Sequence, residues 1–189
     1  MAVAEFVSQY YDTLDLSNFN YICNANVGVA VSYGGNNPAY CTQGHFIEAL
    51  LDIEYISAIA GPIPLTDIYF TPYSILNWIN FVVSMASPPL VHSISYGLDE
   101  VQQVSVAYQH SCNVQFMIAG TLGLTIVFAA GDTGAWGRTG LSNGVFSPDF
   151  PASSPYVTAV GGTDFAVQSV IGPETTWICG GGGFSNVFS

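Results

Sequence analysis

The stretch LTIVFAAGDTG, residues 124–134, joins one of the most apolar runs of the chain to a glycine turn with a single acidic residue, Asp132. A short apolar run that contains β-branched residues and ends in glycine is typical of a buried strand in a parallel sheet. In such sheets the carboxyl ends of the strands are where ligands bind. Asp132 is therefore either a cap of the turn or a chemical group of a site.

The alternation of apolar runs with amphipathic stretches extends over the whole chain. We expect strands at 27–35, 66–71, 90–97, 124–131 and 156–163, and helices at 2–11, 45–61, 74–87 and 101–120. This pattern predicts an α/β fold with a doubly wound, mostly parallel sheet and helices on both faces. At 189 residues, half of them hydrophobic, the chain is long enough for one core, so we expect a single domain over residues 1–189.

Segment 114–131 offers an alternative, because it contains no charged residue before the turn and could cross a membrane as a helix of about 27 Å. Gly120 and Gly123 interrupt it, however, and no basic flank sets an orientation. We therefore expect a helix, a glycine turn and a strand, and no membrane association.

The charge of the chain restricts its partners. One Lys or Arg against thirteen Asp and Glu gives a formal net charge of −12, which argues against nucleic acid as a partner. Carboxylates lose their charge at acidic pH, so this composition points to an acidic compartment. The four cysteines lack the close spacing of a zinc or redox motif and are expected to form one or two disulfides or to be buried thiols.

Glu48 and Asp52 lie four residues apart in an expected helix, and therefore on one helix face. An exposed acidic face is the ordinary interpretation of such a pair. The neighbouring residues are apolar, however, and two carboxyl groups that are close and partly desolvated titrate as a coupled pair. Such a pair is a candidate general acid and base.

Five motifs, in this order, resemble those of the sedolisins, the serine-carboxyl peptidases. The motifs are EALLD (48–52), SISYG (93–97), FAAGDTG (128–134), FPASSPYVTAVGGT (150–163) and GGGGFSNVF (180–188). The resemblance covers essentially the whole chain and implies a subtilisin-like fold. It also implies an acid-active serine-type peptidase that releases tripeptides from free N-termini of peptide substrates.

The resemblance assigns a role to each carboxyl group. Glu48 matches the general base toward the catalytic serine, and Asp52 matches the acid that orients it. Asp132 matches the oxyanion-hole aspartate, whose protonated carboxyl stabilises the tetrahedral intermediate. The SISYG motif resembles the strand edge along which substrate pairs, so Ser95, Tyr96 and Gly97 are expected to bind substrate.

The chain also departs from the family pattern. The nucleophile of the family is the serine of a GTSAS-type motif that follows GGGFSNVF, and none of Ser153, Ser154 and Ser185 occurs in such a motif. The calcium ligands of the family also lie beyond Ser189, so we expect no cofactor in this chain itself.

We therefore expect the N-terminal part of a truncated catalytic domain, inactive alone, whose partner is the remainder of that domain. The resemblance implies a lysosome, an acidic vacuole or secretion as its location. The alternative is a catalytically dead homologue that binds a peptide or a partner.

Overall fold

The structure, a computed structural model, describes residues 1–43, 46–139 and 144–188. It contains two compact units, Met1–Ser95 and Tyr96–Ser189. The expectation that residues 1–189 form one truncated catalytic domain stays a prediction.

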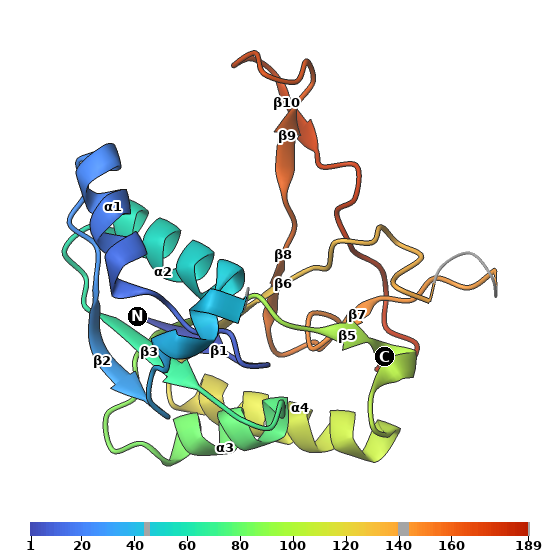
Figure 1. Cartoon of the computed structure of the whole chain (residues 1–189). Coiled ribbons are helices and arrows are strands. Elements are labelled where there is room, and N and C mark those ends of the chain that lie inside the picture. Colours follow the sequence, from blue (N-terminus) through green and yellow to red (C-terminus); the bar gives the residue numbers. More distant parts are fainter. Residues whose placement is uncertain (44–45, 140–143, 189) are drawn as a thin grey trace. The chain divides into compact units, whose positions relative to one another are not determined.

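The first unit is built on a parallel sheet. Its elements are β1 (Ala2–Glu5), α1 (Thr13–Cys23), β2 (Val29–Tyr33), a 3₁₀ helix (Pro38–Gln43), α2 (Ile47–Ala60), β3 (Leu65–Tyr69), α3 (Ile75–Ser84) and β4 (Val91–Ile94). The strand order is β2-β3-β1-β4, and each neighbouring pair is parallel. Helices α1 and α2 cover one face of these strands and α3 covers the other (Figure 1).

Apolar side chains between α1, α2 and the strands form the core of the first unit. Its buried members are Val3, Leu16, Val27, Leu50, Ile53 and Leu65. Helix α3 buries a separate stripe at the spacing of one helix face, which consists of Ile75, Trp78, Ile79 and Val82. This packing fixes α2, and with it the Glu48 and Asp52 pair, against the sheet.

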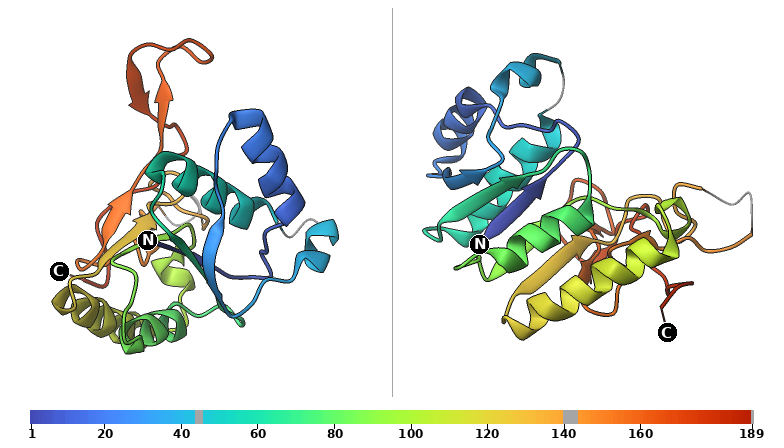
Figure 2. Two further views of the ribbon diagram at one scale, coloured as in Figure 1. Left: turned by 90° about the vertical axis from the view of Figure 1, so that its left-hand side faces the viewer. Right: turned by 90° about the horizontal axis from the view of Figure 1, so that it is seen from below.

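The second unit contains the stretch that ends in Asp132. Its elements are β5 (Leu98–Asp99), a 3₁₀ helix (Glu100–Gln102), α4 (Val106–Thr121), β6 (Thr125–Ala129), β7 (Asp149–Phe150), β8 (Thr158–Val160), β9 (Thr163–Phe165) and β10 (Glu174–Thr176). Strands β6 and β8 are parallel, whereas β5–β7 and β9–β10 are antiparallel pairs. Helix α4 lies beside β6 (Figure 2). Parallel strands with packed helices thus confirm the expected α/β class.

The helix expected at residues 2–11 is wrong. Residues Ala2–Glu5 form β1, which pairs with β3 on one side and β4 on the other. Because β1 is an inner strand with both faces covered, all four of its residues are buried and show no alternation that marks a strand. The helix of this region begins later, at Thr13, after Asp12 accepts a hydrogen bond from the Leu14 N–H at 2.7 Å.

The helix expected at residues 101–120 begins five residues late, at Val106, because the Ser105 hydroxyl caps it by accepting from the Tyr108 N–H at 3.0 Å. The apolar segment 114–131 then divides as expected into the end of α4, a turn and β6. In the described part of the chain, no helix has the length and apolar character needed to cross a membrane.

Candidate functional site

The structure brings Asp52 of α2 into contact with Ser95, directly after β4. The Ser95 hydroxyl donates a hydrogen bond to Asp52 Oδ1 at 2.7 Å. The other carboxyl oxygen, Oδ2, is buried and has no hydrogen-bond partner among the residues that the structure describes. The sequence predicted Ser95 as a substrate-binding residue. Its hydroxyl has a partner within the protein, and its role in substrate binding stays a prediction.

The pKa of Asp52 is raised from 3.8 to about 7. Burial is the largest cause, the hydrogen bond from Ser95 opposes it, and the negative charge of Glu48 adds to it. Glu48 lies one helical turn before Asp52 and is half-buried. Its backbone N–H donates to Gln9 Oε1 at 3.2 Å. At acidic pH, Asp52 therefore holds its proton near a second carboxyl group, and coupled titration of the two groups stays a prediction.

Such a pair can perform acid and base chemistry. A neutral Asp52 can donate a hydrogen bond to a neighbouring carboxylate and so favour its ionised form. An ionised Glu48 could then accept a proton from a hydroxyl group placed within hydrogen-bond reach. The catalytic roles of Glu48 and Asp52 stay predictions.

Between about pH 4 and pH 7, thermal stability is expected to fall less with rising pH in Asp52→Asn than in the wild type. The pKa of Asp52 is about 7 in the folded chain and near 3.8 when exposed. The folded state therefore keeps a proton that the unfolded state releases, and this contribution to stability is lost as the pH rises through 7. The wild type should lose up to about 1.4 kcal/mol per pH unit over this window through Asp52 alone.

The measurement is Tm by calorimetry at pH 4 to 8. Asp67, with a pKa raised by burial to about 6, and His92, with a pKa lowered by burial to about 4, also titrate, but both are present in wild type and variant alike. Glu174→Gln, at an exposed carboxyl group, is the control. Equal slopes of Tm against pH in wild type and Asp52→Asn would contradict the prediction.

Asp132 lies on an exposed turn of the second unit, directly after β6. Gly131 and Gly134 have φ values of 103° and 64°, which residues with a side chain rarely adopt. Both glycines are tied to the glycine-rich segment, because Gly181 N–H donates to Gly131 O at 2.7 Å and Gly134 N–H donates to Cys179 O at 2.9 Å. The turn is thus held by its backbone while the carboxyl group reaches solvent. That Asp132 shares a cleft with Glu48 stays a prediction.

Close packing around residue 97 favours glycine at this position. A Cβ atom at this position would lie 3.1 Å from Phe150 O and 3.4 Å from Asp149 Oδ2. Substrate binding by Ser95, Tyr96 and Gly97 stays a prediction.

Three charged residues of the second unit were missed by the sequence reasoning. Arg138 Nη1 lies 2.6 Å from Asp149 Oδ1 and 3.6 Å from Asp99 Oδ1. One signal could have found them, since Arg138 is the only Lys or Arg of the chain. A lone cation in so acidic a chain is expected to have a specific acidic partner.

Of the two alternatives expected for the cysteines, disulfides or buried thiols, the structure shows thiols and no disulfide. All four are free thiols, with Cys41 and Cys112 buried and Cys23 and Cys179 exposed. Burial raises the pKa of Cys112 to about 12, so this thiol is a packing group. Within the described ranges, no three His, Cys, Asp or Glu side chains are grouped so that they could hold a metal ion.

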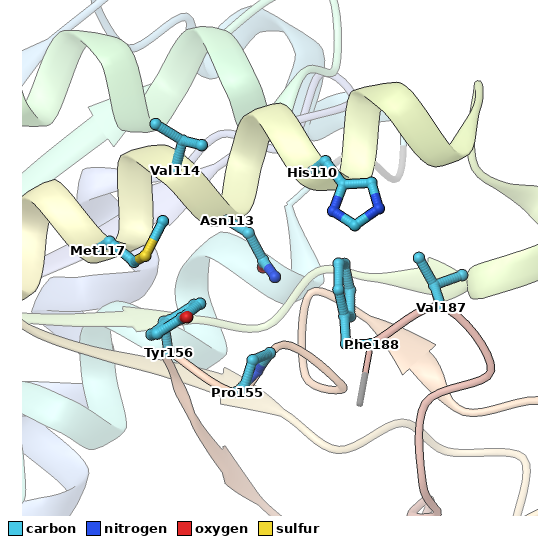
Figure 3. Close-up of a pocket in the computed structure, with 8 residues that line it drawn as sticks. All are labelled: His110, Asn113, Val114, Met117, Pro155, Tyr156, Val187 and Phe188. Carbon is cyan, nitrogen blue, oxygen red and sulfur yellow. The ribbon is translucent and has the colours of Figure 1, made fainter.

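The second unit also contains a pocket of about 290 Å³ between α4 and later segments (Figure 3). It is lined by His110, Asn113, Val114, Met117, Pro155, Tyr156, Val187 and Phe188. None of the residues predicted for catalysis or substrate binding lines it, so it is separate from the predicted site residues.

Two known proteins that are similar in sequence to this chain share one name. No family model matches the chain. It is 40% identical over 201 residues to "Tripeptidyl-peptidase 1" of Mus musculus, covering 99% of this chain and 34% of that protein, and 39% identical to the Homo sapiens protein of the same name with the same coverage. The chain thus spans about a third of the length of these curated relatives.

A solved structure shares the fold. It is "Pseudomonas sedolisin (serine-carboxyl proteinase) complexed with two molecules of pseudo-iodotyrostatin", with a TM-score of 0.70, 22% sequence identity, and coverage of 94% of this chain and 52% of that one. At this identity the likeness shows the fold alone, and it agrees with the parallel strands and packed helices described above.

Proposed function

We propose that this chain, a relative of tripeptidyl-peptidase 1 with the fold of a sedolisin, is part of the catalytic domain of an acid-active serine-carboxyl peptidase. The observation that carries the proposal is the Asp52 carboxyl group. It is held by Ser95, is partly buried beside Glu48, and has a pKa raised by burial to about 7. A perturbed carboxyl pair of this kind suits acid and base catalysis at acidic pH.

In the proposed mechanism, Glu48 takes the proton of a serine hydroxyl while the serine oxygen attacks the peptide carbonyl carbon. Asp52 orients Glu48, and the protonated carboxyl of Asp132 donates a hydrogen bond to the oxyanion. Collapse of the intermediate breaks the C–N bond, and Glu48 returns the proton to the leaving amine. Water then repeats the sequence on the acyl-enzyme, with Glu48 again as the base.

The contacts of three serines in this chain support a nucleophile from another segment. Ser153 donates its hydroxyl to the buried carboxylate of Glu100 at 2.6 Å, and the Ser185 hydroxyl donates to the same oxygen. Ser154 is buried and its hydroxyl oxygen accepts from the Tyr156 N–H at 3.2 Å. These hydroxyl groups are used to hold the fold, so the proposed nucleophile is the serine of a GTSAS-type motif beyond Ser189.

The proposed substrate is a peptide with a free N-terminus, from which a tripeptide is released. The backbone at Ser95, Tyr96 and Gly97 is proposed to pair with it as an added strand. A net charge of −12 at pH 7 falls as carboxylates take up protons, which supports a lysosome, an acidic vacuole or an acidic extracellular medium as the place of action. The remainder of the catalytic domain is the proposed partner, together with its calcium site.

The deciding experiment reads the transcript past Ser189 and assays the product of the complete coding sequence. We expect an in-frame GTSAS-like motif and release of tripeptides from a peptide with a free N-terminus at acidic pH. The same peptide with an acetylated N-terminus is the matched control and should not be cleaved. A stop codon directly after Ser189, with binding but no cleavage of peptides, would support the catalytically dead homologue instead.

A further inference from the structure

Two buried carboxyl groups face each other in the second unit. Asp99 of β5 and Asp149 of β7 are directly opposite in an antiparallel pair. Their exposed fractions are 0% and 6%. Like charges at directly opposed strand positions repel each other, and burial makes the repulsion stronger. The pair is therefore stable only with a bound proton or a cation between the two groups.

Arg138, the only Lys or Arg of the chain, lies beside this pair of carboxyl groups. Arg138 donates from Nη1 to Asp149 Oδ1 at 2.6 Å, and the same nitrogen lies 3.6 Å from Asp99 Oδ1. Burial by itself raises the pKa of Asp99, but hydrogen bonds from the Arg138 and Thr139 N–H groups outweigh it and lower the pKa. Burial and the neighbouring Asp99 raise the pKa of Asp149, against the opposing effect of Arg138.

Both carboxyl groups also touch the turn that bears Asp132. Asp99 accepts from Arg138 N–H at 3.0 Å and from Thr139 N–H at 2.8 Å, directly after the turn. A Cβ atom at Gly137 would lie 2.7 Å from Asp99 Oδ1, and one at Gly131 would lie 2.8 Å from Asp149 Oδ2. The two ends of segment 131–139 therefore rest on the same pair of carboxyl groups, at contacts too close for any residue but glycine.

We propose that Asp99, Asp149 and Arg138 form a charge clamp that fixes segment 131–139, and that they are positioning residues for the Asp132 carboxyl group. The clamp itself depends only on contacts within the second unit. Its consequence for catalysis rests on the function proposed above. With Arg138 in place, one positive charge balances one carboxylate. Without it, the turn should stay ordered only when Asp149 carries a proton.

Amide hydrogen exchange of segment 131–139 in the purified chain tests the clamp. Arg138→Met keeps most of the side-chain volume and removes the charge. We expect exchange to become about tenfold faster or more at pH 7, which corresponds to about one pKa unit of lost interaction. At pH 4.5, where Asp149 can take up a proton, the difference should largely disappear.

A second substitution separates charge balance from simple loss of packing. The double variant Arg138→Met/Asp149→Asn removes the like-charge pair while Asp99 keeps its backbone donors, so exchange should return to within about threefold of wild type at pH 7. Lost packing would instead make the two substitutions additive. Glu174→Gln, at an exposed carboxyl group on β10, is the matched control and should leave this segment unchanged.

The outcomes are distinct. Unchanged exchange in Arg138→Met, a difference that is independent of pH, or no rescue in the double variant would overturn the clamp. If Arg138→Met does not fold, the double variant decides, because the clamp predicts that it folds and protects the segment. In the complete protein, a loosened turn should lower kcat more than it changes KM. Normal turnover with a loosened turn would refute the role of Asp132 and leave the clamp intact.

Discussion

Glu48→Gln in the complete protein is expected to lower kcat/KM by about 10³-fold or more at every pH tested, because general-base catalysis typically contributes about 10²- to 10⁴-fold. Glutamine has a similar shape but cannot accept the serine proton, and Asp52, with its pKa raised to about 7, is protonated across the acidic range. No shift of pH should therefore restore the rate. Burst kinetics should show that acylation, rather than release of the product, is lost.

Glu54→Gln is the matched control for this experiment, since Glu54 lies on the same helix and burial also raises its pKa. It has no place in the proposed mechanism and should retain wild-type activity. Comparable losses in both variants would point to damage of α2. Near-normal turnover of Glu48→Gln would show that another group takes the proton.

Asp132→Asn is expected to move the alkaline limb of the pH profile of kcat/KM to higher pH. An ionised Asp132 has no proton to donate to the oxyanion, whereas an asparagine amide donates at every pH. Asp132→Ala removes the donor altogether and should lower kcat by about 10²- to 10³-fold, the usual effect of losing one oxyanion-hole donor. The measurement is kcat/KM from about pH 3 to 8 on a short peptide with a free N-terminus.

Glu174→Gln should leave both limbs of this profile in place. An alkaline limb that stays unmoved in Asp132→Asn would mean that the Glu48 and Asp52 pair, rather than Asp132, sets it. The limbs of a coupled group belong to the whole group, so the comparison between variants carries more information than either limb of one protein.

Local sequence patterns identified most elements of the fold. The apolar run at 124–131 predicted β6, and the apolar stripe at 74–87 predicted α3. Both predictions were possible because the periods of strands and helices are local properties of the sequence. The pattern failed at Ala2–Glu5, where the strand is buried on both faces. There, tertiary pairing with two neighbours decides the structure, and no alternation remains to be seen.

In the candidate site, too, some features follow from the local sequence and others only from the tertiary structure. The spacing of Glu48 and Asp52 determined by itself that their carboxyl groups share a helix face, because one turn of α2 separates them. The hydrogen bond from Ser95 to Asp52 joins residues 43 positions apart in the sequence, so only the tertiary structure could create it. That contact and the surrounding burial set the pKa of Asp52.

The sequence by itself thus determined the parallel α/β class, the carboxyl pair on α2 and the glycine turn around Asp132, since each depends on residues close together in the chain. Only the tertiary structure decided that Asp99 and Asp149 oppose each other with Arg138 between them. Two short strands far apart in sequence must pair in one register to bring these charges together. Strand register depends on the whole surrounding core, and therefore no local pattern of residues records it.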